Sequence, residues 1–148
     1  SRFGFKGTRH VKKAFAILKE KYPNDFELII EGKLPLKQYL DFIGKVNVVI
    51  DQTNSYSVGL NGLFSMAMGK IVLGGAELET LSSLGFKSTP VINIIPNYMS
   101  IVSEIENLLK NKDKIKDLGY KSRKFVENNH DGRKIAQAYL ETWMNTKS

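Results

Sequence analysis

The chain has 148 residues, of which 42% are apolar and 25% are charged, with 22 basic against 15 acidic side chains. This length and balance suit one globular domain with its own core. They exclude a disulfide framework and thiolate chemistry, because there is no cysteine, and a membrane-spanning helix, because no apolar run approaches about 18 residues. His10 and His130 lie far apart without ligand-like spacing, which argues against a zinc site.

The net charge of +7 points to an anionic partner: a nucleotide, a nucleic acid or an acidic membrane surface. The alternative is that the lysines only solvate helices. Basic residues concentrate in 9–21 and 110–124. These stretches lack the interleaved aromatic residues that stack on bases, which disfavours nucleic acid as a partner.

In the first part of the chain, helical and strand patterns alternate. Thr8 is expected to cap a helix over 8–22, whose apolar residues recur every three or four positions. Then follow, in order, a short strand over 26–32 ended by Gly32, a helix over 34–45 with Pro35 in its first turn, and a strand over 46–51.

The second part continues the alternation and then becomes helical. We expect a helix from position 59 to Gly69-Lys70, a strand over 70–75, a short helix over 76–85, a strand over 90–95, and helices over 98–111, 112–130 and 131–145. Strands that alternate with helices predict βαβ units. The expected fold is α/β: a Rossmann-like, doubly wound parallel sheet with helices on both faces, on which the C-terminal helices pack back. There are no repeats or internal linkers, so residues 1–148 are treated as a single domain.

The opening segment "SRFGFKGT" enters a helix without a strand before it. In doubly wound folds such a loop leaves the carboxyl end of a strand. We therefore expect the chain to be part of a larger protein, with the first strand of the sheet upstream. The neighbours of that strand would then have an unpaired edge, which favours swapping or dimerisation.

Open parallel sheets bind ligands beyond the carboxyl ends of their strands, and three loops are expected there: 1–8, 31–35 and 54–61. In the last, Gly59, Leu60 and Asn61 are predicted to form the first turn of a helix, whose unpaired N–H groups attract anions. Arg2 and Lys6 could neutralise the same diphosphate from the opposite side.

Each of these features has a purely structural interpretation as well. Lys6-Gly7 is also typical of a simple turn, and Gly59 and Gly62 are also typical of close packing between a helix and a sheet. No GxSxG, HExxH or Walker-type motif occurs, and Asp51 has no evident catalytic partner in the sequence. The residues are therefore expected to bind and orient a substrate.

Three stretches are similar to the C-terminal, donor-binding half of GT-B glycosyltransferases of the family-4 type. They are "SRFGFKGT" with its helix, "VNVVIDQ" leading to "VGLNGLFSMAMGKIVL", and "LGYKSRKFVENNHDGRKIAQAYLETW". The resemblance implies a retaining, metal-independent sugar transferase that needs no cofactor and takes a nucleoside diphosphate sugar as donor. Basic side chains and a helix N-terminus would stabilise the leaving diphosphate, which is electrostatic catalysis.

Carried over by position, Arg2 and Lys6 match the catalytic basic pair that contacts the diphosphate. The donor-binding positions are Gly7, Gly32, Tyr56, Gly59, Leu60, Asn61 and Phe64; no metal ligand is implied. The family has glutamates where Tyr56 and Phe64 stand. Because phenylalanine accepts no hydrogen bond, unmet ribose hydroxyls at Phe64 should cost about 1–3 kcal/mol of binding.

The resemblance further implies an acceptor-binding N-terminal domain in the same protein, without which this fragment should be inactive. It also implies surface polysaccharide or glycolipid synthesis in the cytoplasm, with the basic helices resting on the anionic inner face of the membrane. The alternative, favoured by Phe64, is a degenerate transferase-like domain that binds a partner without turnover.

Overall fold

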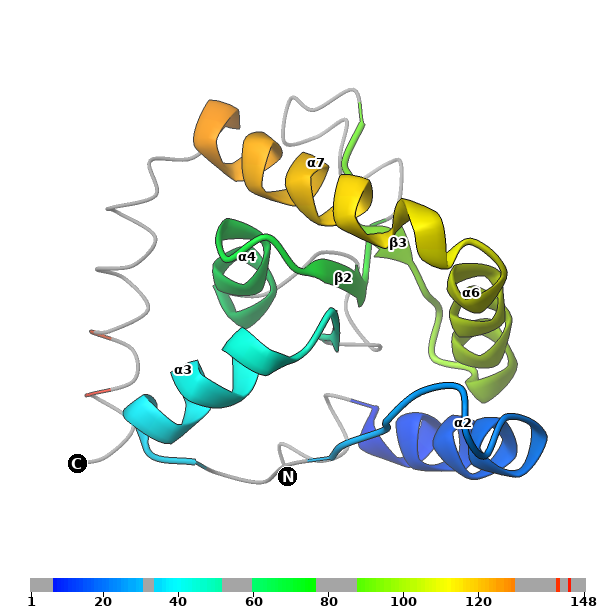
Figure 1. Ribbon diagram of the computed structural model, residues 1–148. Helices are drawn as coiled ribbons and strands as arrows, with labels where there is room; N and C mark the ends of the chain where they lie inside the picture. The colour runs from blue at the N-terminus through cyan, green and yellow to red at the C-terminus, as the bar shows by residue number, and fades with distance from the viewer. Residues whose placement is uncertain are drawn as a thin grey trace.

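The computed structural model describes residues 7–30, 34–51, 60–76 and 88–129, together with Glu141 and Met144. These residues form an α/β fold in which a parallel sheet of three strands lies between helices (Figure 1). The strands are β1 (Val48–Ile50), β2 (Ile71–Gly74) and β3 (Ile92–Asn93), in the spatial order β1-β2-β3. The helices are α2 (Thr8–Lys21), α3 (Leu36–Lys45), α4 (Leu60–Ala67), α6 (Tyr98–Lys110), the 3₁₀ turn η1 (Lys112–Lys114) and α7 (Ile115–Asn129).

The central strand β2 organises the core, since all four of its residues are buried. Successive side chains of a strand point to opposite faces. Ile71 and Leu73 belong to a cluster with α2 and α6, whereas Val72 belongs to a second cluster with α4 and α7. The sheet is therefore covered on both faces, as expected for a parallel sheet.

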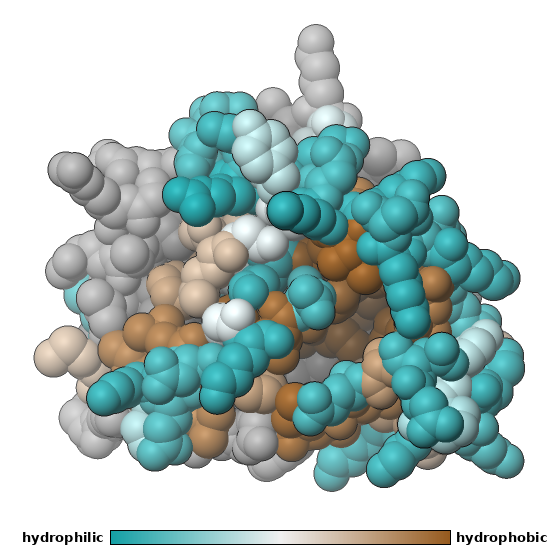
Figure 2. All heavy atoms as spheres, in the orientation of Figure 1, coloured by the Kyte–Doolittle hydropathy of each residue, from teal (hydrophilic) through white to brown (hydrophobic). Residues whose placement is uncertain are grey.

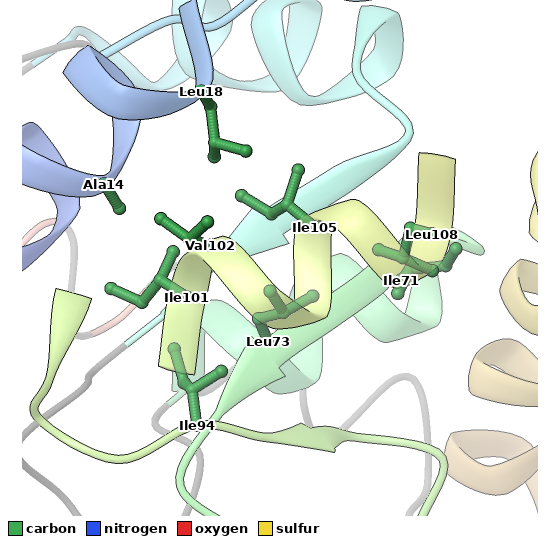
Figure 3. Close-up of a cluster of buried hydrophobic side chains, with 9 residues drawn as sticks. All are labelled: Ala14, Leu18, Ile71, Leu73, Ile94, Ile101, Val102, Ile105 and Leu108. Atoms are coloured by element: carbon green, nitrogen blue, oxygen red, sulfur yellow. The ribbon is translucent and has the colours of Figure 1, made fainter. Parts of the chain in front are cut away.

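Figure 3 shows the larger cluster, in which aliphatic side chains of α2 and α6 meet those of β2. Leu108 lies beside Ile71 at the start of β2, and Ile101 lies toward Ile94, which follows β3. The buried members are Ala14, Leu18, Ile71, Leu73, Ile94, Ile101, Val102, Ile105 and Leu108. Burial of each large aliphatic side chain stabilises the fold by about 1.5–3 kcal/mol.

On the other face, α4 and α7 pack closely because small residues lie between them. Gly62 and Ser65 of α4 and Gly119 and Ser122 of α7 are all buried. The Ser65 hydroxyl donates to the Asn61 carbonyl oxygen at 2.8 Å, so this buried polar group is satisfied within its own helix.

Helix α4 ends at a left-handed glycine, as the Gly69-Lys70 pair predicts. Gly69 has a φ of 77°, and its N–H donates to the Met66 carbonyl at 2.9 Å. The next N–H, that of Lys70, donates to the Ser65 carbonyl at 3.0 Å. These two bonds form a Schellman motif, which terminates a helix where glycine can adopt positive φ.

Several helix predictions are confirmed. Helix α3 starts directly after Pro35, α6 occupies 98–110, and η1 with α7 occupies 112–129. Asn97 caps α6, because its side-chain oxygen accepts the Met99 N–H at 2.8 Å. The helices predicted over 76–85 and 131–145 lie outside the described residues, apart from Ala76, which is not helical, and the helical Glu141 and Met144.

Two local predictions are wrong. Gly7, and not Thr8, is the N-cap of α2: its φ is 69°, and its carbonyl accepts the Val11 N–H at 3.4 Å. The strand predicted over 26–32 is not formed in its described part, 26–30. Phe26 and Leu28 pack partly buried against the larger cluster, but an apolar pattern specifies burial and not a partner strand for hydrogen bonds.

The expected strand over 46–51 is confirmed as β1, although its three residues are only half-buried. The strand expected over 90–95 is confirmed as the short β3. Among the helices that the structure describes, none combines the length and the apolar character needed to cross a bilayer.

We predict that Gly119→Ala destabilises the fold. An added Cβ would lie 2.3 Å from the Gly69 carbonyl oxygen, a backbone atom that cannot move without shifting the turn before β2. The free energy of unfolding should fall by about 1–3 kcal/mol, although alanine favours helix more than glycine does. Urea unfolding measures this change.

Gly44→Ala in α3 is the matched control, because no atom lies within 4 Å of its added Cβ. This variant should keep the wild-type stability or gain up to about 1 kcal/mol. Equal effects of the two substitutions would contradict the proposed close contact of α4 and α7.

Candidate anion-binding site

The direction of each helix relative to the sheet decides which helix ends lie near the carboxyl ends of the strands. Helix α4 is followed within a few residues by β2, so its C-terminus lies at the amino end of that strand. Eight helical residues span about 12 Å, comparable to the four residues of β2 at about 13 Å. Because α4 packs on β1 and β2, its amino end reaches the carboxyl edge of the sheet.

Helix α3 also ends near the amino edge of the sheet. It ends at Lys45 and β1 begins at Val48. Lys70, at the amino end of β2, donates from Nζ to the Gly44 carbonyl oxygen at 3.1 Å. This contact fixes the C-terminus of α3 at the amino edge.

Four residues separate the end of β3 from the start of α6, so the first turn of α6 also lies at the carboxyl edge. Helix α2 packs beside α6 and runs in the same direction, as three contacts show. Lys13 Nζ lies 4.0 Å from the centre of the Tyr98 ring, Lys21 Nζ lies 2.5 Å from Glu106 Oε1, and Lys112 Nζ lies 3.9 Å from Asp25 Oδ1. The amino end of α2, with Gly7, therefore shares this edge.

Charge is distributed unequally between the two edges. Helices α2, α4 and α6 start at the carboxyl edge, and none has an acidic residue in its first turn. In contrast, η1 and α7 start at the opposite edge and carry Asp113 and Asp117 in their first turns. Acidic residues stabilise helix N-termini, so the partial positive charge of the three described starts at this edge is not offset by a carboxylate within the same helix turn.

Exposed basic side chains lie near the start of α2, which is at the carboxyl edge of the sheet. Arg9, Lys12 and Lys13 are exposed in the first half of α2, which has no acidic residue before Glu20. Asp51 lies at the same edge, directly after β1, where its N–H donates to the Leu73 carbonyl oxygen at 2.8 Å. Figure 2, in the orientation of Figure 1, shows hydrophilic residues around a hollowed middle where hydrophobic residues are visible.

Four of the predicted site residues lie in the described ranges. Gly7 is buried at the start of α2, Leu60 and Asn61 form the beginning of α4, and Phe64 is half-buried one turn later. Arg2, Lys6, Gly32, Tyr56 and Gly59 lie outside the described residues. The structure thus brings the neighbours of the two expected phosphate loops, Gly7 and Leu60, to one edge of the sheet from opposite faces.

Two side-chain hydrogen bonds to Glu106 join the end of α2 to α6; we call this group of Lys21, Tyr22 and Glu106 the clamp. Glu106 Oε1 accepts from Lys21 Nζ and, at 2.9 Å, from the Tyr22 hydroxyl. These hydrogen bonds, that of Lys21 first, lower the pKa of Glu106 and raise the pKa of Lys21 and of Tyr22. Sequence reasoning missed the clamp because its partners are 84 and 85 positions apart.

Comparisons with protein-family models, with curated proteins and with solved structures found no match to this chain. Within the described ranges, no group of three or more histidine, aspartate or glutamate side chains is arranged to hold a metal ion. The function must therefore be argued from the helix directions and the charge distribution.

We predict that Glu106→Gln lowers stability at neutral pH and has little effect at low pH. A carboxylate whose pKa is lowered by folding stabilises the protein above its unfolded pKa of about 4.3. That contribution is lost as the pH falls through the lower, folded value. The difference between the urea midpoints of wild type and variant should thus be present above about pH 5 and vanish in acid.

Glu104→Gln is the control, on the same helix and outside the ion pairs of the described residues. It should show no comparable pH-dependent difference. A Glu106→Gln effect that persists undiminished to pH 2 would contradict the clamp.

Proposed function

We propose that this domain binds the diphosphate of a nucleoside diphosphate sugar at the carboxyl edge of its sheet, as the donor-binding half of a GT-B, family-4-type glycosyltransferase. The main support is the charge distribution: three described helices, α2, α4 and α6, start at this edge without an acidic residue in the first turn. Helix N-termini that converge beyond strand ends are the usual site for phosphates in open α/β sheets.

In this proposal Arg2 and Lys6, which precede Gly7 in the sequence, hold the diphosphate from the side of α2. The N–H groups at Gly59, Leu60 and Asn61 hold it from the side of α4. Charge builds up on the departing diphosphate during sugar transfer, and both groups stabilise that charge without a metal ion. A second domain of the same protein would bind the acceptor. The protein would act in the cytoplasm, at an anionic membrane surface.

The finer fold assignment, a doubly wound Rossmann-like domain, is part of this proposal. The described β1-β2-β3 sheet with α2 and α6 on one face and α4 and α7 on the other agrees with it. In such a fold further strands would extend the sheet beyond β1.

The second candidate is a transferase-like domain that has lost turnover and retains only a binding role. Phe64 favours it, because this half-buried side chain offers no acceptor where the family presents a glutamate to the ribose. Such a domain would bind a diphosphate more weakly, or a ligand without a ribose.

We predict that UDP or GDP binds the chain and that Lys6→Ala weakens binding about tenfold, since a charge-assisted hydrogen bond contributes about 1.5–3 kcal/mol. Isothermal titration calorimetry measures the affinity. Lys116→Ala is the control, because this exposed lysine lies in the first turn of α7, at the opposite edge. Absence of any nucleotide binding, also in a complete two-domain protein, would refute the donor-binding role.

We also predict that Phe64→Glu strengthens nucleotide binding by about fivefold to tenfold, because a carboxylate can accept the ribose hydroxyl protons. The comparison of UDP with uracil-free ribose 5-phosphate and pyrophosphate identifies the part of the ligand responsible. Phe64→Gln, which restores an acceptor without charge, separates hydrogen bonding from electrostatics. Unchanged or weaker binding by a folded Phe64→Glu variant would contradict the assignment of this position.

A further inference from the structure

The outer face of α7 forms one wall of a hollow of 420 Å³. The other wall is formed by residues 88–90, which lead into β3. The hollow is shallow and largely open to solvent, so a ligand bound there would keep part of its surface in water. Since residues 88–90 precede β3, the hollow lies at the amino end of that strand, away from the proposed diphosphate site. Its lining residues are Ser88, Thr89, Pro90, Tyr120, Lys121, Lys124, Phe125, Asn128 and Asn129.

The lining residues of α7 recur at two adjacent positions every fourth residue, which places them on one face of the helix. The opposite face, with Gly119, Ser122 and Val126, is buried. The outer face of α7 thus combines an aromatic ring with two amides and two ammonium groups.

Tyr120 is 60% exposed, and its ring is the most accessible flat apolar surface of the hollow. An aromatic ring has a negative face, which attracts the polarised C–H groups on one face of a sugar ring. Lys124 Nζ lies over this ring, 5.6 Å from its centre. A sugar that stacks on this face would therefore displace the ammonium group to the side, where it could contact an acidic group of the ligand.

The polar groups around the ring suit a ligand with several hydroxyls. The Thr89 hydroxyl oxygen accepts the Val91 N–H at 3.3 Å, which leaves its own O–H to donate. The Asn129 amide nitrogen donates to the Phe125 carbonyl oxygen at 2.9 Å, which leaves its oxygen to accept. Ser88 and Asn128 add a further donor and acceptor each.

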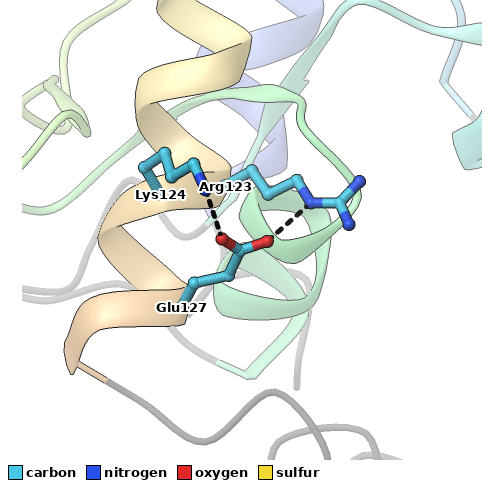
Figure 4. Close-up of polar contacts among 3 residues, drawn as sticks. All are labelled: Arg123, Lys124 and Glu127. Carbon is cyan, nitrogen blue, oxygen red and sulfur yellow. Dashed lines mark hydrogen bonds and ion pairs between the residues drawn. The ribbon is translucent and has the colours of Figure 1, made fainter.

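The two lysines can turn toward an anion at little cost. Lys121 pairs with Asp117 at 3.0 Å and Lys124 with Glu127 at 3.0 Å, all with exposed side chains. Exposed pairs of this kind stabilise little. Glu127 also accepts from Arg123 Nε at 2.9 Å on its other oxygen (Figure 4), so it stays paired when Lys124 leaves.

Hydrogen bonding to Glu127 raises the pKa of Lys124, and Lys124 and then Arg123 lower the pKa of Glu127. Lys124 is thus positively charged at neutral pH.

We propose that this hollow is a binding site for an anionic saccharide, with the sugar ring on Tyr120, the acidic group at Lys121 and Lys124, and the hydroxyls at Asn128, Asn129 and Thr89. The site is independent of the proposed donor site.

The experiment is an NMR titration of the ¹⁵N-labelled full chain with glucuronic acid at pH 7. We expect saturable shifts confined to the amides of Ser88 and Thr89 and of residues 120–129. Glucose and acetate, which each supply one half of the ligand chemistry, should bind at least about tenfold more weakly. Equal binding of acetate or inorganic phosphate would show a simple anion site, and tighter binding of UMP a nucleotide site; either result would overturn the proposal.

Variants of exposed residues test the roles of the ring and the charges. Tyr120→Ala should weaken binding about fivefold, and Tyr120→Phe, which keeps the ring, by less than about twofold. Lys121→Gln with Lys124→Gln should weaken binding about tenfold. Lys116→Gln, on the same helix outside the hollow, should leave binding unchanged. Unaltered affinity in Tyr120→Ala would overturn the proposal.

UDP titration of the same variants keeps the two sites apart. Tyr120→Ala and the wild type should give the same result with UDP: equal affinity if UDP binds, and no binding in either protein if it does not. A loss of both ligands together in a folded Tyr120→Ala variant would show that the hollow is not an independent site.

Discussion

Burial of β2 on both faces is the constraint on which the rest of the structure depends. Ile71 and Leu73 require one apolar helical layer, and Val72 requires another. A parallel strand buried in this way cannot form without both layers, because each exposed aliphatic side chain would lose the free energy of its burial. The two layers in turn fix the helices whose first turns meet at the carboxyl edge.

Helix direction, more than any single side chain, favours the binding of an anion at the carboxyl edge of the sheet. Helices that connect parallel strands return antiparallel to them, so their N-termini gather at one edge. Among the helices that the structure describes, α2, α4 and α6 start at that edge without an acidic residue in the first turn, whereas Asp113 and Asp117 occupy the starts of η1 and α7 at the other edge. Local sequence and global topology thus favour an anion at the same place.

Close contact between glycines links the second face to the proposed saccharide site. Gly69 allows the chain to turn from α4 into β2, and Gly119 lets α7 approach that turn. The buried face of α7 is thereby fixed, and with it the direction of the face that carries Tyr120 and Lys124. A tight interface on one side of the helix orients a binding surface on the other.

The sequence by itself determined the helices with strong periodicity, the end of α4 at Gly69, and the alternation that gives a parallel sheet. These features depend on local backbone preferences and on which residues are apolar, and both are written in neighbouring positions. The failures at Thr8 and at 26–30 have a common reason: a cap and a strand need partners whose positions the local pattern does not give. Only the tertiary structure decided that α2 and α4 cover opposite faces of the sheet, that Glu106 joins α2 to α6, and that residues 88–90 face α7, because these contacts join segments far apart in the chain.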